Sequence, residues 1–246
     1  MYSQAAVSLT RSQAAPFAAA AEPAPTLRDL FKGQSAETLA AGEALFWEGD
    51  PAGQIFDVIS GVLRVYRIMP DGRRAIMGFI HPGDVLGVSF QNRYLFTAEA
   101  VTEVKIRRFA RSRFFGLINE TPALRPQLFA ILCDEMSAAQ DQMLLLGRKN
   151  AEERVVSFLL SVHRKVGIGA DIELPMSRLD MADYLGLTME TVSRMMTSLA
   201  RRGLIALGAR HTVTLRKLAA LREIAGHDAE DEDIAAAPAR RAVWPH

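Results

Sequence analysis

The chain has 246 residues, of which 49% are hydrophobic, and its formal net charge is only +1. This length suggests one or two domains with enough apolar residues for a buried core, as in a soluble globular protein. The single cysteine, Cys133, excludes an intramolecular disulfide and an iron–sulfur cluster held by the cysteines of one chain. No run of about 18 apolar residues occurs, so we expect no membrane span and a cytoplasmic location.

The charge is distributed unevenly along the chain. Between Arg148 and Glu223 there are 13 Lys and Arg residues against 8 Asp and Glu, whereas Ile224–His246 contains 2 against 5. A basic segment favours a polyanion such as nucleic acid as partner, although an ordinary solvated surface could have the same balance.

Residues 1–26 are rich in Ala, Ser, Gln and Pro, and we predict a disordered extension there. From residue 27 to residue 121 the pattern changes to short apolar strands separated by Gly and Pro turns. Strands are predicted at 44–48, 54–60, 62–68, 73–80 and within 97–109. The pair Asp71-Gly72 marks a hairpin turn between two of them. Many short strands at this spacing predict a β-roll, a small jelly roll.

Residues 122–147 are predicted to form one long helix. Its apolar residues recur at steps of three and four over about three heptads, which is the spacing of a coiled-coil seam. The seam comprises Phe129, Leu132, Met136, Ala139, Met143 and Leu146. We therefore predict a parallel dimerisation helix, with packing of this helix on its own domain as the alternative. Cys133 lies beside the seam and is expected to be a small buried side chain rather than a sensor.

Residues 148–225 predict a winged helix-turn-helix. Ser177 and Thr188 can cap the N-termini of two short helices, and Gly186 permits the tight turn between them. The other expected elements are a hinge at 148–150, an amphipathic helix at 151–165, wing strands at 204–207 and 212–215, and a short helix at 216–225. Residues 226–246 are acidic and then rich in Ala, Pro and Arg, so we predict a disordered tail.

The second helix of this motif has two contrasting faces. The face predicted to be buried comprises Val192, Met195, Met196 and Leu199. The opposite face carries Glu190, Ser193 and Arg194. Arginine can donate two hydrogen bonds to guanine, glutamate can accept one from cytosine N4, and serine can do either. We predict that these three residues contact DNA bases, with a surface Glu190–Arg194 ion pair as the alternative. The candidate phosphate contacts, or else simply solvated side chains, are Thr188, Arg201, Arg202 and Arg210.

A β-roll followed by a long helix and a winged helix-turn-helix resembles the Crp/Fnr family of bacterial transcription regulators. The matching motifs are Pro82-Gly83-Asp84, Ala151-Glu152-Glu153-Arg154-Val155, Asp183-Tyr184-Leu185-Gly186-Leu187-Thr188 and Glu190-Thr191-Val192-Ser193-Arg194. The resemblance implies an α+β fold with a cyclic-nucleotide-binding-like β-roll, and a homodimer that binds double-stranded DNA and RNA polymerase. It also implies that Glu190, Ser193 and Arg194 occupy the base-reading positions for a target like TTGAT-N4-ATCAA.

The β-roll departs from the cyclic-nucleotide-binding members of this family. Those members carry a Gly-Glu pair and a later Arg-Ser or Arg-Thr pair, whereas this chain has Gly87-Val88-Ser89 and no such Arg before Ala98. The carboxylate for the ribose and the guanidinium for the phosphate are both missing, which argues against binding of cAMP or cGMP.

Other segments look most like the FixK type of the family. They are Phe96-Thr97-Ala98-Glu99-Ala100, Leu144-Leu145-Leu146-Gly147-Arg148 and Gly208-Ala209-Arg210. The N-terminal cluster-binding cysteines of Fnr-type members are missing. This resemblance implies a regulator, mainly an activator, of microaerobic, anaerobic or nitrogen-fixation genes that acts without a known effector.

An effector-dependent sensor of the same architecture is the alternative function. His81, in the loop before Pro82, could be an axial haem ligand, although a lone loop histidine is more often simply solvated. An enzyme is not expected, because the sequence has no phosphate-binding Gly loop and no set of His, Cys and acidic residues with metal-ligand spacing. We therefore predict no catalytic residues, no cofactor and no metal site.

Overall fold

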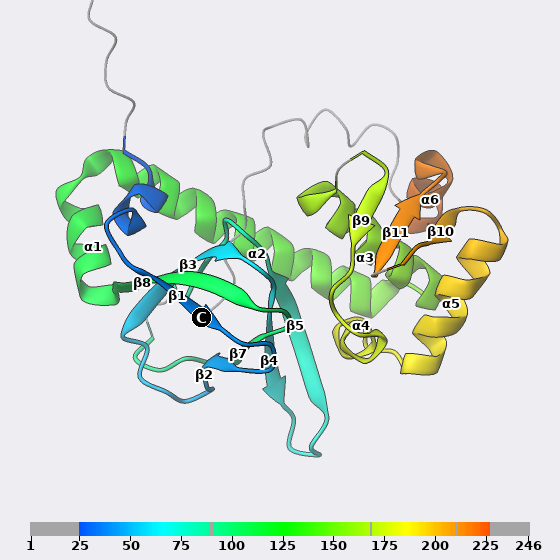
Figure 1. Ribbon diagram of the computed structural model, residues 1–246, viewed down its shortest axis with the longest axis horizontal. Helices are drawn as coiled ribbons and strands as arrows, with labels where there is room; N and C mark the ends of the chain where they lie inside the picture. Colours follow the sequence, from blue (N-terminus) through cyan, green and yellow to red (C-terminus); the bar gives the residue numbers. More distant parts are fainter. Residues whose placement is uncertain (1–24, 89–90, 168, 210, 227–246) are drawn as a thin grey trace, which may run out of the picture.

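The computed structural model describes residues 25–88, 91–167, 169–209 and 211–226. As predicted, the fold is α+β, and a long helix, α2 (Arg125–Arg148), joins a β-roll to a mainly helical C-terminal half (Figure 1). The predicted disordered segments, 1–26 and 226–246, lie outside the described residues except for Pro25, Thr26 and Gly226. Within the described ranges no helix is long and apolar enough to cross a membrane.

The β-roll consists of two four-stranded antiparallel sheets that pack face to face. The strand order is β1-β8-β3-β6 in one sheet and β2-β7-β4-β5 in the other. The strands are β1 Ala36–Leu39, β2 Ala44–Phe46, β3 Gln54–Ser60, β4 Leu63–Ile68, β5 Arg74–Ile80, β6 Val85–Leu86, β7 Thr97–Ala100 and β8 Val104–Ala110. Inward-facing residues such as Phe56, Val58 and Val65 form the core between the sheets. The predicted Asp71-Gly72 turn joins β4 to β5, and Gly72 has the positive φ of 83° that favours glycine there.

The structure adds elements that the sequence pattern does not predict. They are the 3-10 helix η1 (Leu27–Phe31), strand β1, the two-residue strand β6 and helix α1 (Arg111–Glu120). Helix α1 follows β8 directly, and its buried residues are Phe114 and Ile118. They pack with Phe31 of η1 in a second core on the outer face of the β1-β8-β3-β6 sheet. Because this helix buries only one pair at i, i+4 spacing, its periodicity is too weak to recognise in the sequence.

Helix α2 begins at Arg125, after a 3-10 turn at Pro122–Leu124 (η2), and not at residue 122 as predicted. The residues that α2 buries against its own chain are Leu128, Glu135 and Leu145. These three positions lie on one side of the helix, so most of its circumference is left for other contacts.

Glu135 is the unusual member of this buried side. It is only 8% exposed, and neither carboxyl oxygen has a hydrogen-bond partner among the residues that the structure describes. Burial therefore raises the pKa of the Glu135 carboxyl to about 8, because an unpaired charge is costly away from water. The ordinary pKa of 4.5 applies in the unfolded chain. The stability that the protonated Glu135 carboxyl provides is therefore fully present below pH 4.5 and is lost as the pH rises toward about 8.

The variant Glu135→Gln is expected to become increasingly more stable than the wild type between pH 5 and pH 8. The amide of glutamine cannot ionise. Each unit by which the pKa of Glu135 differs between the folded and the unfolded chain corresponds to roughly 1.4 kcal/mol of stability. The free energy of unfolding of the variant should therefore exceed that of the wild type by on the order of 2–4 kcal/mol at pH 8. Urea unfolding of both proteins at several pH values measures this difference in stability. Asp134→Asn, which removes the neighbouring carboxylate, is the control. Parallel pH–stability curves for Glu135→Gln and wild type would contradict the prediction.

The C-terminal half contains the helices and the wing that the sequence predicts. Its elements are α3 Ala151–Val166, β9 Asp171–Glu173, α4 Arg178–Leu185, α5 Met189–Arg201, β10 Ile205–Leu207, β11 Thr212–Leu215 and α6 Leu218–Ala225. The wing hairpin of β10 and β11 is extended by β9 into a three-stranded sheet, in the order β10-β11-β9. The four helices enclose a core that includes Leu159, Leu185, Leu199 and Leu221.

The junction between α2 and α3, predicted to be a hinge, is held by several hydrogen bonds. Asn150 caps α3, because its side chain accepts hydrogen bonds from two backbone N–H groups of the first turn. The Arg154 guanidinium donates to the carbonyls of Leu146 and Lys149 at the end of α2. It also donates to the carbonyl of Leu185 at the end of α4. One side chain thus satisfies carbonyl groups at the C-termini of two helices and holds them together.

One hydrophobic core extends across both halves of the chain. Tyr66 and Ile76, of β4 and β5, belong to the same cluster as the buried residues of α3, α4 and α5. The centroid of the Phe79 ring in β5 lies 6.1 Å from that of the Phe158 ring in α3. It lies 5.7 Å from the centroid of the Tyr184 ring in α4. The helix-turn-helix is therefore packed directly on the β-roll, with β5 beside α4 (Figure 1).

Candidate DNA-binding surface

Helices α4 and α5 form the predicted helix-turn-helix, and the local signals act as expected. Ser177 caps α4, because its Oγ accepts from the Asp180 N–H while the Asp180 carboxylate accepts from the Ser177 N–H. Gly186 ends α4 in the left-handed conformation, with a φ of 61°. Thr188 caps α5 by accepting a hydrogen bond from the Thr191 N–H. These start and stop signals are confirmed.

The inner face of α5 fixes the helix on the C-terminal core. Val192, Met196 and Leu199 are almost completely buried, as predicted, whereas Met195 is half-buried at the edge of the core. Because α5 is anchored along its length, its outer face has a defined orientation.

The outer face of α5 presents Glu190, Ser193 and Arg194, and all three are exposed. Their i, i+3 and i+4 spacing brings them together on one side of the helix. Hydrogen bonds from its own backbone and from Thr188, with the Arg194 charge, hold the pKa of Glu190 below its ordinary value. Arg194 donates a long hydrogen bond, 3.4 Å, to Thr191 Oγ1. The face thus offers an ionised acceptor, a hydroxyl and a guanidinium, and base contact by these groups stays a prediction.

The four candidate phosphate contacts differ in their surroundings. Thr188 is exposed, and its Oγ1 already caps α5. Arg201 is exposed on the same side of α5 as the three residues just described, near the other end of the helix. Arg202 forms an ion pair with Glu152 of α3, which a phosphate would have to replace. Arg210 lies outside the described residues.

An apolar stripe runs along the exposed side of α2. Phe129, Met136, Met143 and Leu146 are between 40% and 67% exposed, Leu132 is half-buried and Ala139 is exposed. Most of this predicted seam is therefore not packed on its own domain. Large apolar side chains that are gathered on one face mark an interaction surface.

Cys133 is exposed, so the expectation that it is a small buried side chain is wrong. The reason is its place on the helix: position 133 lies about half a turn around α2 from Glu135, on the side away from its own chain.

His81 is buried, only 4% exposed, so the expectation of a solvated loop residue is also wrong. The turn that contains it is covered by α3, whose Lys165 Nζ lies 2.6 Å from Asp84 Oδ2. Burial, helped by the positive charge of Lys165, lowers the pKa of His81 to about 3, which keeps the ring neutral. The described part of the chain holds no group of three or more His, Cys, Asp and Glu side chains that could bind a metal ion.

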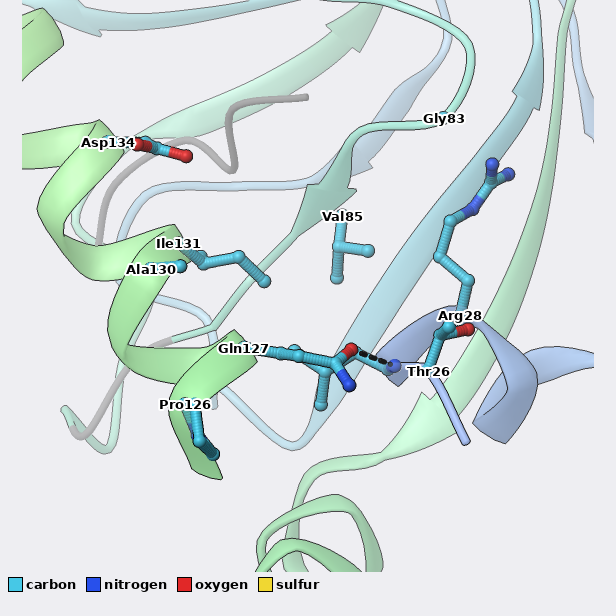
Figure 2. A pocket seen from close by; sticks show the side chains of 10 residues that line it. Thr26, Arg28, Gly83, Val85, Pro126, Gln127, Ala130, Ile131 and Asp134 are labelled. Carbon is cyan, nitrogen blue, oxygen red and sulfur yellow. Dashed lines mark hydrogen bonds between the residues drawn. The ribbon is translucent and has the colours of Figure 1, made fainter. Parts of the chain in front are cut away.

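A cavity of about 590 Å³ lies between η1, β6 and α2, on the outside of the β-roll core (Figure 2). Most of its lining is apolar, as with Ile131, and Gln127 of α2 accepts a hydrogen bond from the Leu27 N–H beside it (Figure 2). Gly87 lies where the cyclic-nucleotide-binding members of the Crp/Fnr family carry their Gly-Glu pair. It does not line this cavity, and Ser89 lies outside the described residues.

Two protein-family models match this chain. A cyclic nucleotide-binding domain matches residues 36–121, and a Crp-like helix-turn-helix domain matches residues 153–224. The matches fall on the β-roll and on the C-terminal half, respectively.

Similar proteins are regulators of transcription. The nitrogen fixation regulation protein FixK of Bradyrhizobium diazoefficiens is 44% identical over 172 residues, which cover 68% of this chain and 73% of that protein. The transcriptional activatory protein AadR of Rhodopseudomonas palustris is 44% identical over 169 residues, which cover 67% and 71%. The solved structure of FixK2 from Bradyrhizobium japonicum has a TM-score of 0.76 and 35% identity, and the match covers 80% of this chain and 99% of that one.

Proposed function

This chain belongs to the Crp/Fnr family of transcription regulators, and we propose that it is a homodimer that reads a TTGAT-N4-ATCAA-like palindrome through α5. The two α5 helices present their outer faces to half-sites about one helical turn, roughly 34 Å, apart. Arg194 donates to guanine O6 and N7, Glu190 accepts from cytosine N4, and Ser193 serves either role.

The exposed face of α5 is the observation that carries this proposal. A helix that is buried along one side and carries an arginine, a serine and a glutamate on the other is suited to entering a major groove. The N-terminal part of such a helix reaches the base edges, which is where Glu190, Ser193 and Arg194 lie. Arg201, farther along, is placed to contact a phosphate.

The apolar stripe on α2 supports the dimer. We assign the contact between two α2 helices to Phe129, Leu132, Met136, Ala139, Met143 and Leu146, packed as a parallel seam. Two reading helices joined in this way match the two-fold symmetry of a palindrome.

The named relatives suggest the physiological role. They include a regulator of nitrogen fixation and a transcriptional activator. We propose that this protein, too, acts mainly as an activator, in the cytoplasm and with RNA polymerase as partner. Its target genes would serve microaerobic or anaerobic metabolism or nitrogen fixation.

Fluorescence anisotropy at fixed salt tests the DNA specificity. The protein is titrated with a TTGAT-N4-ATCAA duplex and with a duplex of scrambled half-sites. Binding to the palindrome should be tighter by at least about a thousandfold, the lower end for specific regulators. Equal affinity for the two duplexes would overturn the proposal.

A regulator controlled by a small molecule is the second candidate, and the cavity beside α2 favours it. Asp134, which lines the cavity, lies about half a turn around α2 from Met143, so a dimer partner on the apolar stripe would leave the cavity open. Thermal melts with cAMP, cGMP and 2-oxoglutarate, and an absorbance spectrum for haem, test it. A ligand at 100 times its dissociation constant should stabilise the fold by about 2.7 kcal/mol.

A further inference from the structure

The contact between the β-roll and the helix-turn-helix has a charged rim beside its aromatic centre. Arg64 of β4 and Arg74 of β5 both reach Asp180 of α4, with nitrogen–oxygen distances of 3.1 and 2.6 Å to Asp180 Oδ1. Arg74 Nε also donates to Asp183 Oδ2 at 2.9 Å. These four side chains, Arg64, Arg74, Asp180 and Asp183, form what we call the interdomain charge cluster.

Asp180 serves two purposes within this cluster. Its Oδ1 accepts from the two guanidinium groups, while its Oδ2 accepts from the N–H and the Oγ of Ser177 at 3.1 and 2.8 Å. The side chain is only 4% exposed, and four donors compensate for its removal from water. The carboxylate that starts α4 is therefore the same group that attaches α4 to the β-roll.

The two arginines are held in place from the β-roll side. Arg64 forms a second ion pair with Glu99 of β7. The Arg74 guanidinium lies over the Tyr66 ring, 5.6 Å from its centroid, and the Tyr66 hydroxyl donates to Glu99 at 2.9 Å. Side chains fixed in this way lose little further freedom when they bind α4, so the contact is well defined.

A separate ion pair attaches α3 to the β-roll. Lys165 Nζ lies 2.6 Å from Asp84, which is completely buried in the turn between β5 and β6. Attachment through α3 and through α4, with the aromatic rings between, restricts both the position and the rotation of the C-terminal half.

The position of α4 is passed on to α5. The two helices are joined by a short turn with Gly186 in the left-handed conformation and Thr188 as the next cap. The cluster contacts neither Glu190 nor Arg194, which stay exposed. The attachment thus fixes the place of the reading face without covering it.

We propose that Asp180 and Asp183 are positioning residues for DNA reading, held by Arg64 and Arg74 so that α5 keeps the place that a correctly spaced palindrome requires. The attachment itself is independent of the proposed function, whereas its effect on DNA binding rests on it. The two parts are therefore measured separately.

Pulsed electron paramagnetic resonance on the full chain tests the attachment without DNA. Spin labels are placed by Ile68→Cys on β4 and Thr197→Cys on α5, both exposed positions, in a Cys133→Ser background. Excess unlabelled protein restricts the signal to distances within one chain. The distance distribution should broaden in Arg74→Glu and stay narrow in Arg74→Lys, which keeps the charge.

The matched control is Arg73→Glu, the same charge change one residue away. The Arg73 side chain is 81% exposed, and within the described residues its ion pair is with the nearby Asp71. The distance distribution of Arg73→Glu should therefore stay narrow. Should Arg74→Glu fail to fold, Asp183→Asn removes one of the two ion pairs of Arg74, the one with Asp183, from the α4 side. A distribution that is as narrow in Arg74→Glu or Asp183→Asn as in Arg73→Glu overturns the proposal.

A series of duplexes with three, four or five base pairs between TTGAT and ATCAA tests the effect on DNA reading. Arg74→Glu should reduce the wild-type preference for four base pairs by roughly fivefold or more, a usual size for coupling between sites, and leave binding to an isolated half-site unchanged. Loss of stability alone would weaken binding to all duplexes equally.

The outcomes are distinguishable. A broadened distance distribution with an unchanged spacing preference overturns the positioning role. A wild-type protein with no preference for the palindrome contradicts the proposed function, while the distance measurement still decides whether the cluster attaches α4 to the β-roll.

Discussion

Replacing Arg194 by alanine is expected to weaken binding to the TTGAT-N4-ATCAA duplex by on the order of 2–6 kcal/mol. A bidentate contact from arginine to guanine is worth about 1–3 kcal/mol, and the homodimer loses one such contact in each half-site. The dissociation constant should therefore rise at least about thirtyfold. Because the Arg194 side chain is exposed, its removal should leave the melting temperature nearly unchanged.

Anisotropy titrations with two duplexes show whether the lost contact reads a base. The second duplex, TTAAT-N4-ATTAA, lacks the guanine of each half-site. The wild type should discriminate strongly between the duplexes. Arg194→Ala should discriminate more weakly, because only the Glu190 contact to the cytosine of the same base pair remains. The control, Arg201→Ala, should weaken both about equally and reduce the salt dependence, as for a phosphate contact. If Arg194→Ala still preferred the guanine-containing duplex as strongly as the wild type, the base-reading assignment would fail.

Replacing Met136 by aspartate is expected to convert the dimer into monomers. Met136 is 60% exposed in the single chain and lies in the middle of the apolar stripe on α2. In a parallel seam the two aspartates would face each other, and burial of unpaired charges costs several kcal/mol. Sedimentation velocity measures the oligomeric state directly, and the monomer should bind the palindrome no better than an isolated half-site.

Ser137→Asp is the matched control for this change. It places the same charge on the next residue of α2, which is exposed and points away from the stripe. This variant should stay dimeric. Dissociation of both variants, or of neither, would show that the dimer contact lies elsewhere.

The helix-turn-helix could be predicted from the sequence because its signals are local. Ser177 and Thr188 each act within three residues, and the turn needs only the left-handed conformation of Gly186. Hydrophobic periodicity likewise reveals the buried face of α5 and the apolar stripe of α2, since each repeats over several turns.

The contacts between the halves could not be predicted, because their partners are far apart in the chain. Arg64 and Asp180 are separated by 116 residues, and nothing in the alternating pattern of β4 marks Arg64 as more than a solvent-facing side chain. The same holds for His81, which is buried because α3 covers its turn. The burial of such residues depends on tertiary packing, which local sequence patterns do not contain.

The aromatic contact between Phe79, Phe158 and Tyr184 also bears on how the protein unfolds. Because one of the apolar cores contains residues of both halves, neither half can lose its structure without exposing part of the other's interior. The chain should therefore melt in a single calorimetric transition instead of two. In a C-terminal fragment made without the β-roll, the Phe158 and Tyr184 rings would lose their contact with Phe79 and become more exposed to water. We expect such a fragment to aggregate.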